Sequence, residues 1–150
     1  MRIVLQRVTE ASVTINNKVK SQISNGLLIL LGIEELDTQE DIDWLVKKVL
    51  ALRIFDDENG VMNKSVRDID GDIIVVSQFT LMASYKKGNR PSYIKAAKHE
   101  ISIPLYNSFC EILSKEFGKE IGTGEFGADM KVRLLNDGPV TICMDTHNKE

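Results

Sequence analysis

Apolar and polar residues alternate along the two runs that open the chain, residues 2–8 and 11–15, which are also rich in β-branched side chains. The pair Asn16-Asn17 is typical of a tight turn, and a third run of strand type, residues 19–23, follows it. Turn residues of this kind between alternating runs predict a hairpin or the start of a meander.

Two continuous apolar runs lie further along the chain, at residues 27–33 and 73–76. Runs of this length and composition predict buried strands. The second run ends abruptly at the segment Ser77-Gln78-Phe79-Thr80, which brings two hydroxyls and an amide. The end of a strand is a common place for a ligand in α/β proteins, although Ser and Thr there often only satisfy backbone groups.

The middle of the chain shows helical spacing. Thr38 can cap a helix, with Asp41 three residues on, and apolar residues then recur at helical intervals at Ile42, Leu45, Val46, Val49 and Leu52. Pro91 is expected to open a short helix, and Pro104 to stand in the first turn of a later one. Gly118 marks the expected end of that later helix, whose predicted buried stripe consists of Leu105, Phe109, Ile112, Leu113 and Phe117.

A proline after a glycine interrupts the last stretch of strand character. The runs 131–135 and 140–144 flank Asn136-Asp137-Gly138-Pro139. Proline is excluded from central ladder positions and is the residue for which a cis peptide costs least, so Gly138-Pro139 predicts a tight corner that can adopt the cis form. Such a corner presents carbonyl oxygens. A plain hairpin turn with Asp-Gly chemistry is the alternative.

Strands at both ends and helices between them place the chain in the mixed α/β class, with a barrel-like or layered β-sheet core and flanking helices. Its 150 residues, 43 % of them apolar, fit a single domain spanning residues 1–150. The longest apolar stretch, residues 27–31, is far shorter than the roughly 20 residues of a membrane span. A soluble, cytoplasmic protein without a membrane partner is therefore expected. Cys110 and Cys143 are both expected to be small core residues.

Charge is distributed unevenly along the sequence. Residues 34–72 hold twelve acids and five bases, whereas residues 73–99 hold five bases and no acid. The bases of this acid-free segment are Lys86, Lys87, Arg90, Lys95 and Lys98, with Tyr85 just before the first of them and Tyr93 among them. Such a segment suits a phosphate-bearing substrate, and a solvated loop is an equally good interpretation.

Side chains that usually carry catalysis are scarce. The two histidines, His99 and His147, stand in charged or polar segments, so a Ser-His-Asp triad or a Cys-His pair has few ways to form. No ligand cluster indicates a metal, and no glycine-rich loop indicates a nucleotide cofactor. An enzyme of this composition would use positioning, main-chain N–H and C=O groups and the substrate itself.

The chain resembles the D-aminoacyl-tRNA deacylase family from its first strand to its last. The resemblance rests on Gln6-Arg7-Val8 with Ala11-Ser12-Val13, Gly26 to Gly32, Arg53-Ile54-Phe55, Met62-Asn63, Val75 to Leu81, Arg90-Pro91-Ser92 and the stretch from Phe126 to Thr141. Tyr93 and Gly127 stand where Phe and Ala would also be expected. Neither lies in the segments around Ser77 and Pro139.

The resemblance implies a proofreading hydrolase that cleaves the ester between a D-amino acid and the terminal adenosine of tRNA. It implies a homodimer with a shared active site, no cofactor or metal, and no DNA partner. Gly138 and Pro139 of one subunit would select chirality in the pocket of the other, with Arg7 bracing the corner. Fixed carbonyls would bind the substrate amino group and exclude an L side chain, whereas glycine would escape exclusion. The residues that the resemblance assigns to the pocket are Ser77, Gln78, Phe79 and Thr80.

Thr80 has two possible roles. It could attack the ester as a nucleophile, or the substrate 2′-hydroxyl could assist while main-chain N–H groups near Phe79 and Thr80 hold the oxyanion. The second role is favoured because the sequence places no base nearby. Two rival functions stay open: a non-catalytic tRNA-binding module that relies on the basic stretch around Lys86, Lys87 and Arg90, and an esterase that uses Thr80 with His99.

Overall fold

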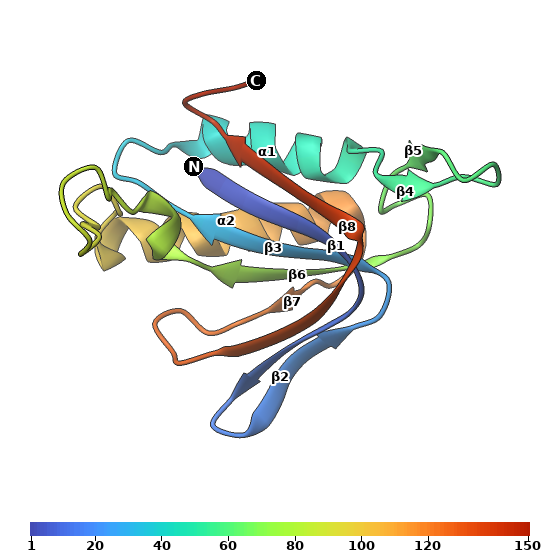
Figure 1. Cartoon of the computed structure of the whole chain (residues 1–150), viewed down its shortest axis with the longest axis horizontal. Coiled ribbons are helices and arrows are strands. Elements are labelled where there is room, and N and C mark those ends of the chain that lie inside the picture. The colour runs from blue at the N-terminus through green and yellow to red at the C-terminus, as the bar shows by residue number, and fades with distance from the viewer.

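One long strand, β1 (Arg2–Ile15), organises the sheet because it pairs with three other strands (Figure 1). Its first half pairs antiparallel with β3, its second half with β2, and β8 runs antiparallel along its other side. The computed structural model describes all 150 residues. The other elements are, in chain order, β2 (Lys18–Ile23), β3 (Gly26–Gly32), α1 (Gln39–Ala51), β4 (Phe55–Asp56), β5 (Met62–Lys64), β6 (Asp72–Ser77), the 3-10 turn η1 (Phe79–Met82), α2 (His99–Phe117), β7 (Gly122–Thr123) and β8 (Lys131–Asp145).

The sheet combines antiparallel and parallel pairs. Its order is β2-β1-β3-β6-β7, and the β3–β6 and β6–β7 pairs are parallel, so α1 and α2 lie in the two crossover connections. The side chain of Ser21 on β2 joins the two ends of this order, since its hydroxyl donates to the Thr123 carbonyl (2.6 Å) and accepts from the Thr123 N–H (3.0 Å). The sheet is therefore a nearly closed barrel, and the predicted fold class is confirmed.

The two faces of the sheet carry separate apolar clusters. Both helices pack on one face, where Phe109 and Leu113 of α2 and Leu45 of α1 are fully buried against β1, β3 and β6. The opposite face lines the inside of the barrel, with the buried side chains Val8, Ala11, Val13, Ile23, Leu28, Ile74 and Val76. Neither helix is long and apolar enough to cross a membrane.

Local signals in the sequence predict several elements correctly. Asn16 and Asn17 adopt positive φ values of 49° and 61° in the turn between β1 and β2. The Thr38 N–H donates to the Asp41 carboxylate (2.7 Å), which forms part of the capping box that opens α1. Gly118 ends α2 in the left-handed conformation, with φ at 77°.

Both proline predictions are wrong. Pro91 opens no helix, because Ser92 exchanges two backbone hydrogen bonds of 2.8 Å with Ser84 and holds the chain extended. Pro104 lies inside α2, which already begins at His99. Pro104 has no N–H, so the carbonyl of Glu100, an exposed residue, lacks its helical donor.

The prediction that both cysteines belong to the core is wrong for Cys143. Ile142 and Met144 of β8 turn toward the helix-covered cluster, so alternation along the strand leaves Cys143 exposed on the other face. Cys110 is half-buried, and burial raises the pKa of its thiol to about 12. Neither cysteine is in a disulfide.

Candidate active site

A turn at the end of β6 forms one wall of the site. Ser77 is the last residue of β6 and pairs with Leu31 of β3, and the Gln78 N–H donates to the Leu31 carbonyl (2.7 Å) one step further on. The chain then enters η1, whose first N–H groups, those of Phe79 and Thr80, have no acceptor within the turn. Two main-chain donors therefore stand beside the strand end.

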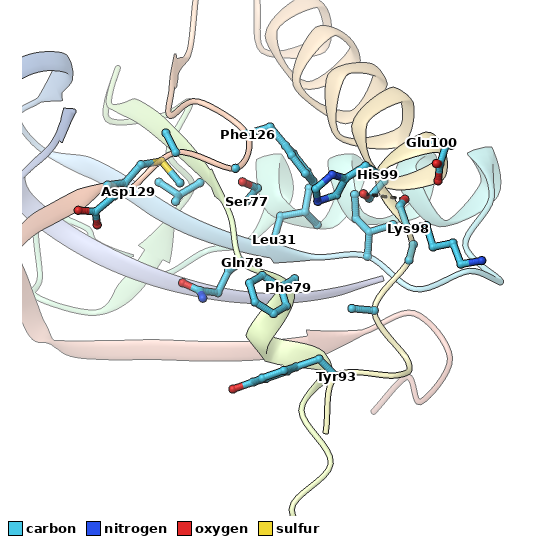
Figure 2. A pocket seen from close by; sticks show the side chains of 18 of the residues that line it. Leu31, Ser77, Gln78, Phe79, Tyr93, Lys98, His99, Glu100, Phe126 and Asp129 are labelled. Carbon is cyan, nitrogen blue, oxygen red and sulfur yellow. Dashed lines mark hydrogen bonds between the residues drawn. The ribbon is translucent and has the colours of Figure 1, made fainter. Parts of the chain in front are cut away.

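A pocket of about 870 Å³ opens beside this strand end (Figure 2). Phe79 and Tyr93 meet edge to face at one end, with ring centroids 5.0 Å apart, and His99 and Phe126 do so at the other, at 5.6 Å. The first residues of α2 and the loop before β8 complete the wall. The lining includes Ser77, Gln78, Phe79, Lys98, His99, Glu100, Asp129 and Met130.

Thr80 differs from the other three residues of its segment, because it does not line the pocket. Its hydroxyl accepts a hydrogen bond from the amide nitrogen of Gln78. An amide nitrogen cannot remove a proton, and no histidine or carboxylate hydrogen-bonds to Thr80. The ring of His99 packs instead on Phe126. The geometry therefore offers Thr80 no general base.

Arg2 contacts η1 on the main chain, and no pattern in the sequence indicates this role. Its guanidinium donates to the Leu81 carbonyl (2.8 Å) and to the carboxylate of Asp145 at the end of β8 (2.6 and 3.0 Å). Burial alone would raise the pKa of Asp145, but the hydrogen bonds from Arg2 and from the His147 N–H outweigh it, and the pKa lies below its ordinary value. Arg2 thus joins the start of β1 and the end of β8 to the turn.

Gly138-Pro139 lies within a single strand, so the hairpin alternative is wrong. Asn136 pairs with Val8 of β1 and Thr141 pairs with Gln6, so the direction of β8 is the same on both sides. Between these pairs, four residues of β8 stand opposite one residue of β1. This bulge, residues 137–140, contains a cis peptide bond between Gly138 and Pro139.

The single residue opposite the bulge is Arg7, whose side chain is 8 % exposed. Its Nε donates to the Asp137 carbonyl (3.1 Å) and lies 3.1 Å from the Asp137 carboxylate. Its Nη1 donates to the Ile54 carbonyl (2.7 Å) and to the carboxylate of Asp56 (3.3 Å). These contacts tie the start of the bulge to the segment before β4.

Gly138 has a φ of +119°, a region that L residues rarely adopt. A Cβ atom there would lie 2.9 Å from Cγ2 of Val140 and 3.0 Å from Nη2 of Arg7. Only glycine fits at position 138 without displacing the side chains of Val140 and Arg7. Gly138 and Pro139 are exposed and do not line the pocket of their own chain. The two predicted site segments therefore do not meet within one chain.

The basic stretch forms a loop beside the pocket. Lys86, Lys87 and Arg90 are exposed and take part in no ion pair, while Tyr93 and Lys98 of the same loop line the pocket.

A cluster of potential metal ligands lies outside the pocket. Glu34, Asp37 and His147 have ligand atoms within 4.8 Å of one another. Asp37 is already paired with the ammonium group of Met1, and none of the three residues lines the pocket.

Comparisons with known proteins agree on one family. The sequence profile of the family described as D-Tyr-tRNA(Tyr) deacylase matches residues 4–145. The D-aminoacyl-tRNA deacylase of Bacteroides thetaiotaomicron is 73 % identical, and that of Phocaeicola vulgatus 70 % identical, over all 150 residues of this chain and the whole of each relative.

Two solved structures share the architecture. One, named c-Myc DNA unwinding element binding protein, is 45 % identical with a TM-score of 0.93, and the match covers 97 % of this chain and 99 % of that one. The other is described as a "probable eukaryotic D-amino acid tRNA deacylase". It is 19 % identical with a TM-score of 0.82, over 95 % of this chain and 97 % of that one, which shows the shared fold.

Proposed function

The chain belongs to the D-Tyr-tRNA(Tyr) deacylase family, and we propose that it hydrolyses the ester bond of D-aminoacyl-tRNA to free D-amino acid and tRNA in the cytoplasm. The observation that carries this function is identity of 70 % and more to D-aminoacyl-tRNA deacylases over the full length of both chains. A pocket walled by main chain and aromatic rings, with no general base at Thr80, is consistent with it.

The proposed mechanism uses main-chain groups and the substrate. The free N–H groups of Phe79 and Thr80 are suited to an oxyanion, because fixed donors need no rearrangement as charge develops. Water attacks the ester carbonyl with assistance from the 2′-hydroxyl of the terminal ribose, and the ribose oxygen of the ester leaves with a proton as a hydroxyl of the free tRNA. Thr80 supports the turn through Gln78 and forms no covalent bond with the substrate. A Thr80 nucleophile is disfavoured because a threonine hydroxyl needs a base to become reactive.

We further propose a homodimer in which Gly138 and Pro139 of each subunit complete the pocket of the other. The open edge of β8 supports this arrangement, since β8 pairs with β1 alone and a long unpaired edge is a template for another chain. Leu135 on this strand is 57 % exposed. The corner then contributes carbonyls to the partner's pocket, where they bind the amino group of a D substrate and exclude an L side chain.

The exposed bases Lys86, Lys87 and Arg90 are proposed to contact tRNA phosphates. Replacing all three with Ala should flatten the salt dependence of tRNA binding by about one unit of slope per lost contact. Lys18, Lys20 and Lys115 are also exposed and unpaired, and their triple Ala variant is the control. An unchanged slope in the variant that lacks Lys86, Lys87 and Arg90 would show that tRNA contacts another surface. Duplex DNA as competitor tests the proposed absence of a DNA partner.

The function is tested by hydrolysis of D-Tyr-tRNA beside L-Tyr-tRNA with the same enzyme. We expect release of tyrosine from the D substrate only. Tight tRNA binding without turnover of either substrate would support the non-catalytic module. Equal turnover of both substrates would contradict a chiral proofreading function.

The shared site is tested separately by mixing Gly138→Ala with Phe79→Ala subunits. If each pocket needs a corner from the partner, random mixing leaves about a quarter of the sites intact, and activity should reappear. Complete inactivity of the mixture, although the subunits have exchanged, would contradict the shared pocket.

A further inference from the structure

The ends of the bulge at residues 137–140 are held by two different side chains. Arg7 acts at the start, through the Asp137 carbonyl. Asn136 acts at the end, because its Oδ1 accepts a hydrogen bond of 3.0 Å from the N–H of Val140, four residues further along the chain. Gly138 and Pro139 lie between these anchor points and have no polar side chains of their own.

The amide of Asn136 is also held in place. Its Nδ2 donates to Oγ1 of Thr141 (3.0 Å), which in turn accepts from the Gln6 amide nitrogen of β1 (3.3 Å). A carboxamide offers an acceptor and a donor on one short planar group, so Asn136 can make both contacts at once. Asn136 therefore connects the end of the bulge to the residue where pairing with β1 resumes.

We infer that Asn136 is a positioning residue that, together with Thr141, sets the direction of the Gly138 and Pro139 carbonyls. Without the bond from Val140 to Asn136, the end of the bulge would be free to rotate, since Val140 stands outside the ladder with β1. Arg7 would still hold Asp137, so the bulge would still form, but the direction of the Gly138 and Pro139 carbonyls would no longer be fixed. The role in selectivity rests on the proposed function.

The first test measures the corner without any activity. Hydrogen exchange of the Val140 amide should be slow in the wild type and about tenfold faster or more in Asn136→Ala, because a single net hydrogen bond is worth about that factor. Asn136→Asp keeps the acceptor and should retain most of the protection. Asn107 is exposed on α2 and forms no hydrogen bond through its side chain, so Asn107→Ala is the matched control. Unchanged Val140 exchange in Asn136→Ala would overturn the inference.

The second test measures selectivity. In Asn136→Ala, the ratio of D-Tyr-tRNA to L-Tyr-tRNA hydrolysis should fall about tenfold or more, with KM for the D substrate rising more than kcat falls. Asn136→Asp should restore most of the ratio, and Thr141→Val should lower it by less. A purely structural role would lower the amount of active enzyme and leave the ratio unchanged, which would contradict the proposal.

The two tests separate the inference from the function. If the wild type hydrolyses neither substrate, the proposed function fails, and the Val140 exchange still decides whether Asn136 holds the corner. If Asn136→Ala does not fold, Asn136→Asp and Thr141→Val carry both measurements. Thr141→Val with wild-type exchange at Val140 and wild-type selectivity would then be the contradicting result.

Discussion

The pocket wall and the Gly138-Pro139 corner are built by different forces. The wall at Ser77 continues a strand whose residues Val75 and Val76 are at most 2 % exposed, so packing fixes its position. The corner is exposed and forms a bulge in β8, which is fixed by the hydrogen bond that Arg7 donates to the Asp137 carbonyl and the one that Asn136 accepts from the Val140 N–H. The shape of the recess therefore depends on the core, whereas the shape of the corner depends on a few polar contacts that can change without unfolding the protein.

The largest effect is expected from Gly138→Ala, which changes the backbone of the corner directly. The new Cβ would meet Val140 and Nη2 of Arg7 and would displace both. Activity on D-Tyr-tRNA should fall about 100-fold, since small displacements of positioning groups cost that much. Gly60 also has a positive φ, with nothing within 4 Å of its Cβ position, so Gly60→Ala controls for backbone strain. Equal activities of the two variants would contradict the assignment.

Arg7→Met should damage the corner and the core beside it, because Arg7 joins the corner to the buried Ile54 carbonyl. Removing a buried, hydrogen-bonded guanidinium should lower the free energy of unfolding by about 3 kcal/mol. Urea unfolding checks this number. Activity, assayed where the variant is still folded, should fall about tenfold, by the loss of one positioning contact. A variant that loses stability but keeps full D selectivity would show that Arg7 braces the core and not the corner.

Thr80→Ala should have a small effect by comparison. The Thr80 hydroxyl contacts only the Gln78 amide, so D-Tyr-tRNA hydrolysis should fall less than about tenfold, as for one lost neutral hydrogen bond. A substrate whose terminal ribose lacks the 2′-hydroxyl should be cleaved far more slowly by both enzymes. Mass spectrometry of a rapidly quenched reaction is the decisive check. An aminoacyl group covalently attached to Thr80 would overturn the proposed mechanism.

The smallest effect is expected at Asp145, whose pKa lies below its ordinary value near 3.8 because of Arg2 and the His147 N–H. A lowered pKa means that the ionised carboxylate stabilises the fold above the ordinary value and that this contribution is lost as pH falls through the folded pKa. Asp145→Asn should therefore lower stability at neutral pH and flatten its decline below pH of about 4. Urea midpoints of both proteins from pH 7 down to 3 measure this. Parallel curves would show that the carboxylate charge contributes nothing.

Sequence reasoning worked where neighbouring residues decide the structure. Asn16-Asn17, the Thr38-Asp41 capping box and the Gly118 stop act over a few residues, and all three are confirmed. It failed where distant contacts decide. The extended conformation at Pro91 depends on Ser84, and the start of α2 at His99 carries no local cap hydrogen bond.

The site divides in the same way. Ser77, Gln78 and Phe79 line a pocket because a strand ends there, which the run at residues 73–76 indicates. Arg2 has no distinctive sequence signal, because its role appears only when β1, η1 and β8 lie side by side. Asn136 acts within β8, on Val140 four residues further on, and its contact depends on the bulge at residues 137–140. An asparagine three residues before a proline in a strand is a signal that could prompt a search for such a contact.

We propose that fixed main-chain groups select the substrate, and hydrolysis of D-Tyr, D-Ala, Gly and L-Ala esters of tRNA by the wild-type enzyme decides this. A corner without side chains should accept both D residues and glycine at comparable rates and should refuse L-Ala, although its side chain is only one methyl group. A pocket of ordinary side chains would grade these substrates by size, since one methylene is worth only about 1 to 3 kcal/mol there. Brisk hydrolysis of L-Ala-tRNA, or activity that falls smoothly with side-chain size irrespective of chirality, would contradict the account.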